Sequence, residues 1–359
     1  MIDFALADEL RLIQQTAREF ADAELRPRDR EFERARGVPD DVRRRYDEIG
    51  LGRVELPESL GGAGLGALAR VLILEELAAA DAGAALALDP LGPALYPLRE
   101  FGGDAALERF AAPLLARPGA RAVLFWDARP RIREVDAVAT GILPWVPSDR
   151  ADLLVVLEKE RAYAIAEGIR CEPLRGAGLR AAGASELHLE RAPIVASWVH
   201  TPQAQRALAR ARLYAAALLV GVMRASADYS RAYAVERQAF GRPIAHHQAL
   251  AFLITDMAAA VETARLLVLD AAWRLDRGEP AAEACASAFL EASEQSMFVT
   301  PNGVQILGGH GFMQDYPVEK YMREARALSL LFGGVDLARD DAGRDLVRSE
   351  GPVPLTVEA

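Results

Sequence analysis

Apolar residues recur at helical spacing through the first third of the chain. The first predicted helix carries one apolar face, formed by Leu10, Ile13, Ala17 and Phe20. Helices are expected over residues 6–25, 40–49, 67–80 and 104–115, with proline- and glycine-bearing segments between them. We therefore expect an N-terminal helical domain over residues 1–120.

The pattern changes near Arg121, where short apolar runs replace the helical period. Five β-prone runs follow, separated by turns, over residues 122–126, 135–140, 153–157, 162–166 and 187–191. No segment between them is long enough to form a crossover helix, so the runs do not make a doubly wound parallel sheet. We expect a small β domain, similar to a barrel or sandwich, over residues 121–200.

Helical spacing returns after Pro202 and continues in long segments. Four helices are predicted, over residues 204–236, 248–275, 280–306 and 318–331. Long helices joined by short connections pack as an antiparallel four-helix bundle, which we expect over residues 201–350. The predicted fold class is therefore α+β with several domains, mostly α, with the β domain in the middle.

Composition excludes several classes of protein. The formal net charge is −10, whereas domains that bind nucleic acid are usually basic. Cys171 and Cys285 stand far apart without CxxC spacing, so we expect no disulfide framework and assign no metal ligands. The N-terminus has no signal-peptide pattern, and the longest apolar run, residues 215–223, is shorter than the roughly 20 residues of a membrane span. We expect a cytoplasmic protein without membrane insertion.

Two short glycine-bearing turns follow long predicted helices in the last third of the chain. They read Arg237-Gln-Ala-Phe240-Gly241 and Gln305-Ile-Leu-Gly308-Gly309-His-Gly. Each can be an ordinary helix end, where glycine and a chain reversal are common, with Phe240 packed against the helix. Each can also contact a dinucleotide, since arginine forms charge-assisted hydrogen bonds to pyrophosphate and exposed backbone amides bind phosphate.

The two turns are more specific in combination with the segments around them. Those segments are Pro57-Glu58-x-x-Gly61-Gly62-x-Gly64, His247-Gln248, Tyr316-Pro-Val-Glu-Lys320 and Met322-Arg-Glu-Ala325. In this order and at this spacing, the set resembles the acyl-CoA dehydrogenase family. The resemblance covers nearly the whole chain, and the family has the same order of helical, β and helical domains.

This resemblance implies a flavoprotein. Members of the family bind FAD, oxidise an acyl-CoA thioester between Cα and Cβ, and pass the electrons to an electron-transfer flavoprotein. A carboxylate removes the α-proton while the β-hydrogen leaves as hydride. The FAD lies across a subunit interface, and the neighbouring subunit contacts its pyrophosphate and adenosine. By position, the residues that make those contacts here are Arg237, Phe240, Gln248, Gln305, Gly308 and Gly309.

Neither of the family's usual base positions carries a carboxylate in this sequence. The glutamate that follows the YPVEK element aligns with Phe332, and the alternative position aligns with Ala211, followed by Arg212. Loss of a positioned base costs about 10²–10⁴-fold in rate, and we assign no catalytic residue. Three other carboxylates lie nearby in the sequence: Asp315, Glu319 and Asp336. Glu319 is better explained as a residue that pairs with neighbouring charges at the start of a helix.

The β domain departs from the family as well. Trp145 matches a tryptophan that packs on the flavin, although a core aromatic residue is an equal alternative. Two residues later the family commonly has a hydroxyl side chain that reaches flavin N5, whereas Pro147 has neither a hydroxyl nor an N–H. The nucleotide half of the FAD site is therefore retained in the sequence, and the isoalloxazine half is altered.

Three functions are compatible with this pattern. The first is a subunit that lends its nucleotide half-site to a glutamate-bearing homologue in a heterotetramer, similar to the shortened members of two-subunit dehydrogenases acting on steroid side chains. The second is a self-sufficient homodimer or tetramer with a non-standard base, and the third is a flavin-free acyl-CoA-binding or scaffold protein. The retained Arg237, Gln248 and Gln305 favour FAD contact, and the missing base favours the paired subunit.

Overall fold

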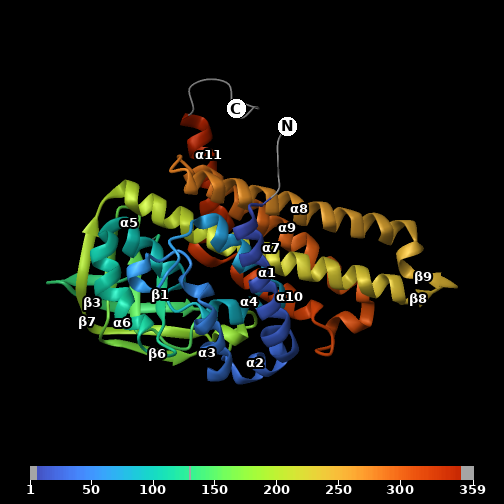
Figure 1. The fold of residues 1–359 in the computed structure, drawn as a ribbon, viewed down its shortest axis with the longest axis horizontal. Coiled ribbons are helices and arrows are strands. Elements are labelled where there is room, and N and C mark those ends of the chain that lie inside the picture. The colour runs from blue at the N-terminus through green and yellow to red at the C-terminus, as the bar shows by residue number, and fades with distance from the viewer. Residues whose placement is uncertain (1–5, 129–130, 349–359) are drawn as a thin grey trace.

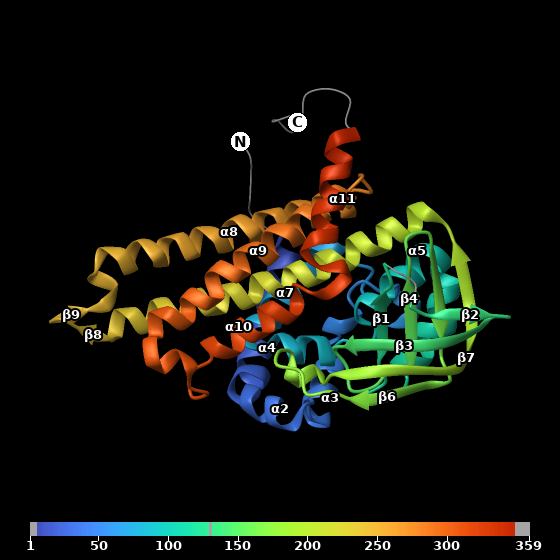
Figure 2. The same ribbon diagram turned by 180° about the vertical axis from the view of Figure 1, so that it is seen from behind.

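The structure is a computed structural model, and it describes residues 6–128 and 131–348. Long helices run along the molecule, and a β sheet closes one end of it (Figure 1). The same arrangement is seen from behind in Figure 2. The order of elements is helical, β and helical, which confirms the fold class predicted from the sequence.

The N-terminal part is helical, as expected. Its helices are α1 (Asp8–Phe20), α2 (Asp29–Ala35), α3 (Asp40–Ile49), α4 (Ala67–Leu88), α5 (Leu95–Ala106) and α6 (Ala112–Leu115). Pro27 does not end the helical course, because it lies in a 3-10 turn that joins the chain directly to α2. The helix predicted to end at residue 80 continues to Leu88, past a kink at Asp81 (φ −160°, ψ 108°).

The central sheet is built around one long strand. The strands are β1 (Ala122–Trp126), β2 (Arg133–Val135), β3 (Val138–Val146), β4 (Leu153–Leu157), β5 (Arg161–Ile165), β6 (Ile169–Pro173) and β7 (Ser185–Val199). The order is β1-β4-β5-β7-β3-β2, with β6 also on β7. The single strand predicted over residues 135–140 is wrong. Asp136 and Ala137 adopt positive φ (53° and 57°) and turn the chain between β2 and β3.

The C-terminal part contains the predicted four-helix bundle and one helix more. The bundle helices are α7 (Thr201–Glu236), α8 (Gln248–Asp276), α9 (Ala282–Leu307) and α10 (Val318–Leu328), and α11 (Gly334–Arg348) packs on α9. A small hairpin, β8 (Gln238–Ala239) and β9 (Arg242–Pro243), connects α7 to α8. No helix in the described part of the chain is long and apolar enough to cross a bilayer.

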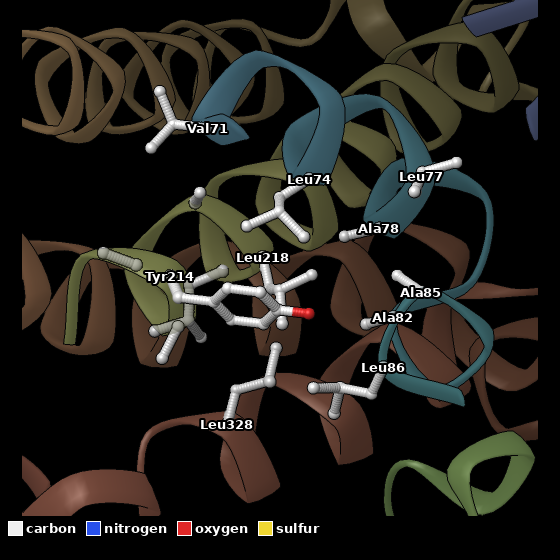
Figure 3. Close-up of a cluster of buried hydrophobic side chains, with 14 of the residues drawn as sticks. Val71, Leu74, Leu77, Ala78, Ala82, Ala85, Leu86, Tyr214, Leu218 and Leu328 are labelled. Carbon is white, nitrogen blue, oxygen red and sulfur yellow. The ribbon is translucent and has the colours of Figure 1, made fainter. Parts of the chain in front are cut away.

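The residues that the structure describes form two apolar cores. One lies within the β sheet, and the larger one joins the N-terminal helices to the bundle. Figure 3 shows part of the larger core, where Leu74 and Leu86 of α4 meet Tyr214 and Leu218 of α7 and Leu328 of α10. Each fully buried leucine contributes roughly 1.5–3 kcal/mol, so the two helical parts stabilise each other.

A buried ion pair also joins α4 to the bundle. Lys320 Nζ of α10 lies 2.9 Å from Asp81 Oδ2 and 3.5 Å from Glu324 Oε1, and all three side chains are fully buried. The kink at Asp81 frees the backbone N–H of Ala84, which donates to Asp81 Oδ1 at 2.8 Å. Burial raises the pKa of Glu324 to about 8.

Candidate functional site

The first predicted turn is an exposed hairpin. Arg237 follows the last residue of α7, and Phe240 (φ 55°) with Gly241 (φ 78°) forms the two-residue turn between β8 and β9. The Phe240 side chain is 95% exposed, so it is not packed against the helix end. The hairpin projects beyond the end of the bundle (Figure 1), where Arg237 is exposed too.

The second predicted turn ends α9 and has an open side. Gly308 (φ 58°) and Gly309 are exposed, and a Cβ built on either would meet nothing within 4 Å. Gly311 is the opposite case, because a Cβ there would lie 2.3 Å from the carbonyl oxygen of Val304. The turn therefore packs through Gly311 and presents Gly308 and Gly309 to the outside, beside the exposed Gln305.

A hydrogen bond holds the two turns at the same end of the bundle. The Tyr233 hydroxyl, one helical turn before Arg237, is 2.8 Å from His310 Nδ1 in the glycine-rich turn. The His310 ring in turn stacks on Tyr316, with centroids 5.0 Å apart. Gln248, the exposed first residue of α8, is separated from the hairpin by one short 3-10 turn (Ile244–His246). Six of the predicted cofactor-binding residues thus gather at this end: Arg237, Phe240, Gln248, Gln305, Gly308 and Gly309.

The seventh predicted residue, Trp145, lies elsewhere. It lies near the C-terminal end of β3, is half-buried, and packs against the larger core. In both views the sheet that carries β3 stands apart from the β8–β9 hairpin (Figure 2). One chain therefore does not bring Trp145 together with the other six residues.

Phe332 aligns with the family's usual base, and its turn contacts α7, the helix that carries Ala211 at the alternative base position. Phe332 is buried in a 3-10 turn (Leu331–Gly333) and has left-handed dihedrals, φ 51° and ψ 39°. The Nε of buried Arg212, on α7, donates to the carbonyl oxygen of Phe332 at 3.3 Å, and its Nη1 lies 2.7 Å from Asp341 Oδ2. Phe332 and Ala211 offer no carboxylate at either base position, and Arg212 places a guanidinium beside Phe332.

A small cavity lies between Phe332 and Pro147. Its volume is about 40 Å³, whereas ligand pockets usually have about 300–1,000 Å³. Asp89 also lines this cavity, and it is a carboxylate that the sequence analysis missed. Its Oδ1 accepts from the N–H of Gly92 at 2.8 Å, and its Oδ2 accepts from the Tyr214 hydroxyl at 3.1 Å. With Arg70 also 3.3 Å from Oδ2, Asp89 is held as part of the fold.

The three carboxylates considered from the sequence do not reach this cavity. Asp315 and Asp336 are exposed. Glu319 forms ion pairs with Arg30 at 2.8 Å and with Arg323 at 2.7 Å, which confirms the charge-pair interpretation.

A larger cavity of about 480 Å³ opens between α1, α4, α7 and α8. All three arginines of its lining are paired with glutamates: Arg18 and Arg224 with Glu76, and Arg265 with Glu75. The size suits a ligand, but no arginine of this lining is left without a carboxylate, and Asp228 and Glu262 add further negative charge.

Comparison with known proteins agrees with this architecture. The family model "Acyl-CoA dehydrogenase, N-terminal domain" matches residues 7–117, and "Acyl-CoA dehydrogenase, C-terminal domain" matches residues 201–347. A probable acyl-CoA dehydrogenase of Mycobacterium tuberculosis is 29% identical, over 96% of this chain and 97% of its own length.

Solved structures share the fold. Butyryl-CoA dehydrogenase from Megasphaera elsdenii superposes with a TM-score of 0.85 at 24% identity, covering 97% of this chain and 100% of its own. A glutaryl-CoA dehydrogenase from Mycobacterium smegmatis in complex with FADH2 gives 0.84 at 20% identity, covering 96% of each chain. With both terminal domains matched and the fold shared along nearly the whole length, the chain belongs to the acyl-CoA dehydrogenase family.

Proposed function

We propose that this chain is a subunit of an FAD-dependent acyl-CoA dehydrogenase, and that it lends its exposed turns to the FAD of a neighbouring subunit that carries the catalytic glutamate. The assembly desaturates an acyl-CoA thioester and passes electrons to an electron-transfer flavoprotein. As the resemblance to paired steroid side-chain enzymes suggests, we propose a heterotetramer. One observation carries the proposal: the space beside Arg237 and Gly308 is open, whereas the cavity beside Phe332 is small.

The open end suits a nucleotide held from outside the chain. Arg237 and Gln305 are exposed, and the space beside Gly308 and Gly309 is free. These residues would hold the pyrophosphate and adenosine of FAD through charge-assisted and backbone hydrogen bonds. The β domain of the same chain stands away from this end, so a second subunit must supply the rest of the cofactor site.

The closed end does not suit the flavin ring. In this family the bound FAD accepts the hydride from the β-carbon. The cavity between Pro147 and Phe332 has a volume of only about 40 Å³, too small for a three-ring system together with a thioester. Phe332 and Ala211 also leave both of the family's base positions without a carboxylate, so the proton must be removed on the partner subunit.

An apolar face on α8 supports an assembled state. Phe252, Leu266 and Trp273 are 60%, 55% and 40% exposed, and their spacing in multiples of seven places them on one side of the helix. Aromatic residues are enriched at protein–protein interfaces, and exposed apolar patches mark such surfaces. This face adjoins the hairpin, where Phe240 is exposed as well.

The proposal is tested by expressing the chain alone and together with a glutamate-bearing homologue from the same source. We expect the chain alone to contain little flavin by absorbance and to turn over no acyl-CoA. The co-purified pair should contain flavin and oxidise acyl-CoA. Turnover by the pure chain would contradict the proposal, and absence of flavin from both preparations would favour a flavin-free scaffold.

Asp89 favours one alternative, a self-sufficient homo-oligomer with a non-standard base. It is a buried carboxylate that lines the same cavity as Phe332. If the pure chain is active, Asp89→Asn should abolish turnover while the flavin content is unchanged. An active chain that tolerates Asp89→Asn would rule out this base.

A further inference from the structure

Arg121 is a buried arginine, and two of its guanidinium nitrogens have no hydrogen-bond partner among the described residues. The residue is only 5% exposed, and its Nε and Nη1 atoms are buried without a hydrogen bond to any residue that the structure describes. Its backbone is fixed, since its N–H donates to Asp152 Oδ2 at 2.9 Å and its carbonyl accepts from Leu153. An unpaired buried charge costs several kcal/mol, so this arrangement calls for a ligand.

Among the described residues, no carboxylate forms an ion pair with Arg121. Asp149 acts on it only through space and contacts Arg150 at 4.0 Å. Arg43 lies nearby, and its own guanidinium donates to the carbonyl oxygens of Val38 and Ala87. The carboxylate of Asp89 is already engaged, as described above. Burial and the positive charge of Arg43 lower the pKa of Arg121 to about 10, so the guanidinium stays charged at neutral pH.

Arg121 lines the small cavity beside Phe332. The other walls include apolar side chains of Leu86, Leu124 and Pro147. The hydroxyl of Ser148, also in the lining, donates to the carbonyl oxygen of Arg150 at 2.6 Å and is therefore not free to donate to a ligand. The volume of about 40 Å³ accommodates about three water-sized atoms, at roughly 10–15 Å³ each.

We infer that this cavity binds a small carboxylate through the guanidinium of Arg121. A carboxyl group has three heavy atoms, and its two oxygens match the paired N–H groups of arginine. The apolar walls suit its carbon side. Phosphate and sulfate have outward oxygens that the apolar walls cannot satisfy. The carboxylate can be a free short-chain acid or the far end of an acyl group, and the inference holds with or without a partner subunit.

Thermal unfolding and calorimetric titration of the full chain with sodium acetate test this site, with sodium chloride at equal ionic strength as reference. Arg121→Met is compared with Arg117→Met, a matched control whose side chain is 58% exposed. We expect acetate to bind the wild type and the control alike, and Arg121→Met at least about tenfold more weakly, the effect of losing a charge-assisted pair. Without acetate, Arg121→Met should unfold no earlier than the wild type.

Further experiments distinguish a free acid from the carboxylated end of an acyl group, and control for misfolding of the variant. A five-carbon acyl-CoA with a terminal carboxylate is compared with the same thioester lacking it. Preferential binding of the carboxylated thioester, lost in Arg121→Met, identifies the acyl end as the ligand, whereas acetate binding alone identifies a free acid. Arg121→Lys keeps the charge and should weaken binding less than Arg121→Met. Equal binding by wild type and Arg121→Met, or no binding of any probe, overturns the inference.

Discussion

The Nε of Arg212 donates a hydrogen bond to the carbonyl oxygen of Phe332 at 3.3 Å. Phe332 aligns with the family's usual base, and Arg212 directly follows Ala211, which aligns with the alternative base position. Arg212 also contacts Asp341 of α11, so the guanidinium fastens the C-terminal helix to the bundle. Beside the position of the family's usual base, Arg212 therefore acts as a structural clamp between α7, the Phe332 turn and α11.

The clamp predicts a measurable loss of stability in Asp341→Asn. The substitution leaves Arg212 buried with its charge uncompensated, at 2% exposure. Because Asp341 itself is 34% exposed, we expect the free energy of unfolding in urea to fall by about 1–2 kcal/mol, less than for a fully buried pair. The double variant with Arg212→Met should be closer to the wild type. An unchanged urea midpoint in Asp341→Asn would show that the pair contributes nothing.

Glu324 predicts a pH dependence of stability. Its folded pKa of about 8 lies above the ordinary 4.5, so the folded state keeps a proton that the unfolded state releases between these values. The stabilisation is therefore present at low pH and lost as the pH rises toward 8, by up to about 1.4 kcal/mol per pH unit.

Glu324→Gln provides the comparison. Urea unfolding of both proteins from pH 5 to pH 9 should give a difference in free energy that grows with pH up to about 8 and then levels off. Parallel curves for the two proteins would mean that Glu324 is not protonated in the folded state.

The glycine-rich turn predicts opposite outcomes for two neighbouring glycines. Gly311→Ala places a methyl group against the carbonyl oxygen of Val304 and should cost at least about 1–3 kcal/mol, as overpacking does. Gly309→Ala meets open space and should leave the thermal midpoint within about 1 °C. Equal thermal midpoints for the two variants would show that Gly311 is not packed against the carbonyl oxygen of Val304.

Arg237→Ala predicts loss of cofactor affinity without loss of stability. The side chain is exposed, so the isolated chain should unfold as the wild type does. In the assembled enzyme, loss of a charge-assisted contact should weaken FAD retention by about tenfold or more, measured by flavin release on dilution. Arg277→Ala, at the opposite end of α8 and paired with Glu279, is the control. Equal retention in both variants would remove Arg237 from the cofactor site.

Elements with strong local patterning could be predicted closely from the sequence. Helix α3 and strand β4 have the predicted bounds, because a proline start and an uninterrupted apolar run define them locally. The turn at Asp136 and Ala137 was missed because neither residue is glycine or asparagine. Helix α11 was missed because its anchor, Arg212, lies far away in the sequence.

In the candidate site, too, residues in local motifs could be predicted, and residues brought together by tertiary packing could not. Arg237 and Gly309 were predicted from short motifs, since each turn is a local structure. Arg121 and Asp89 meet at one cavity only because β1, the end of α4 and the Phe332 turn pack together. No spacing along the chain encodes that meeting, so the cavity and its unpaired guanidinium became visible only in the folded molecule.

The buried contact between Asp81 and Lys320 has a consequence for biosynthesis. The N-terminal helices leave the ribosome long before α10, and until then Asp81 has no cation and α4 has no bundle to cover it. The β domain, with a core of its own, can fold during this interval. The helical packing of the N-terminal domain is therefore completed only after α10, near the end of the chain, has been synthesised.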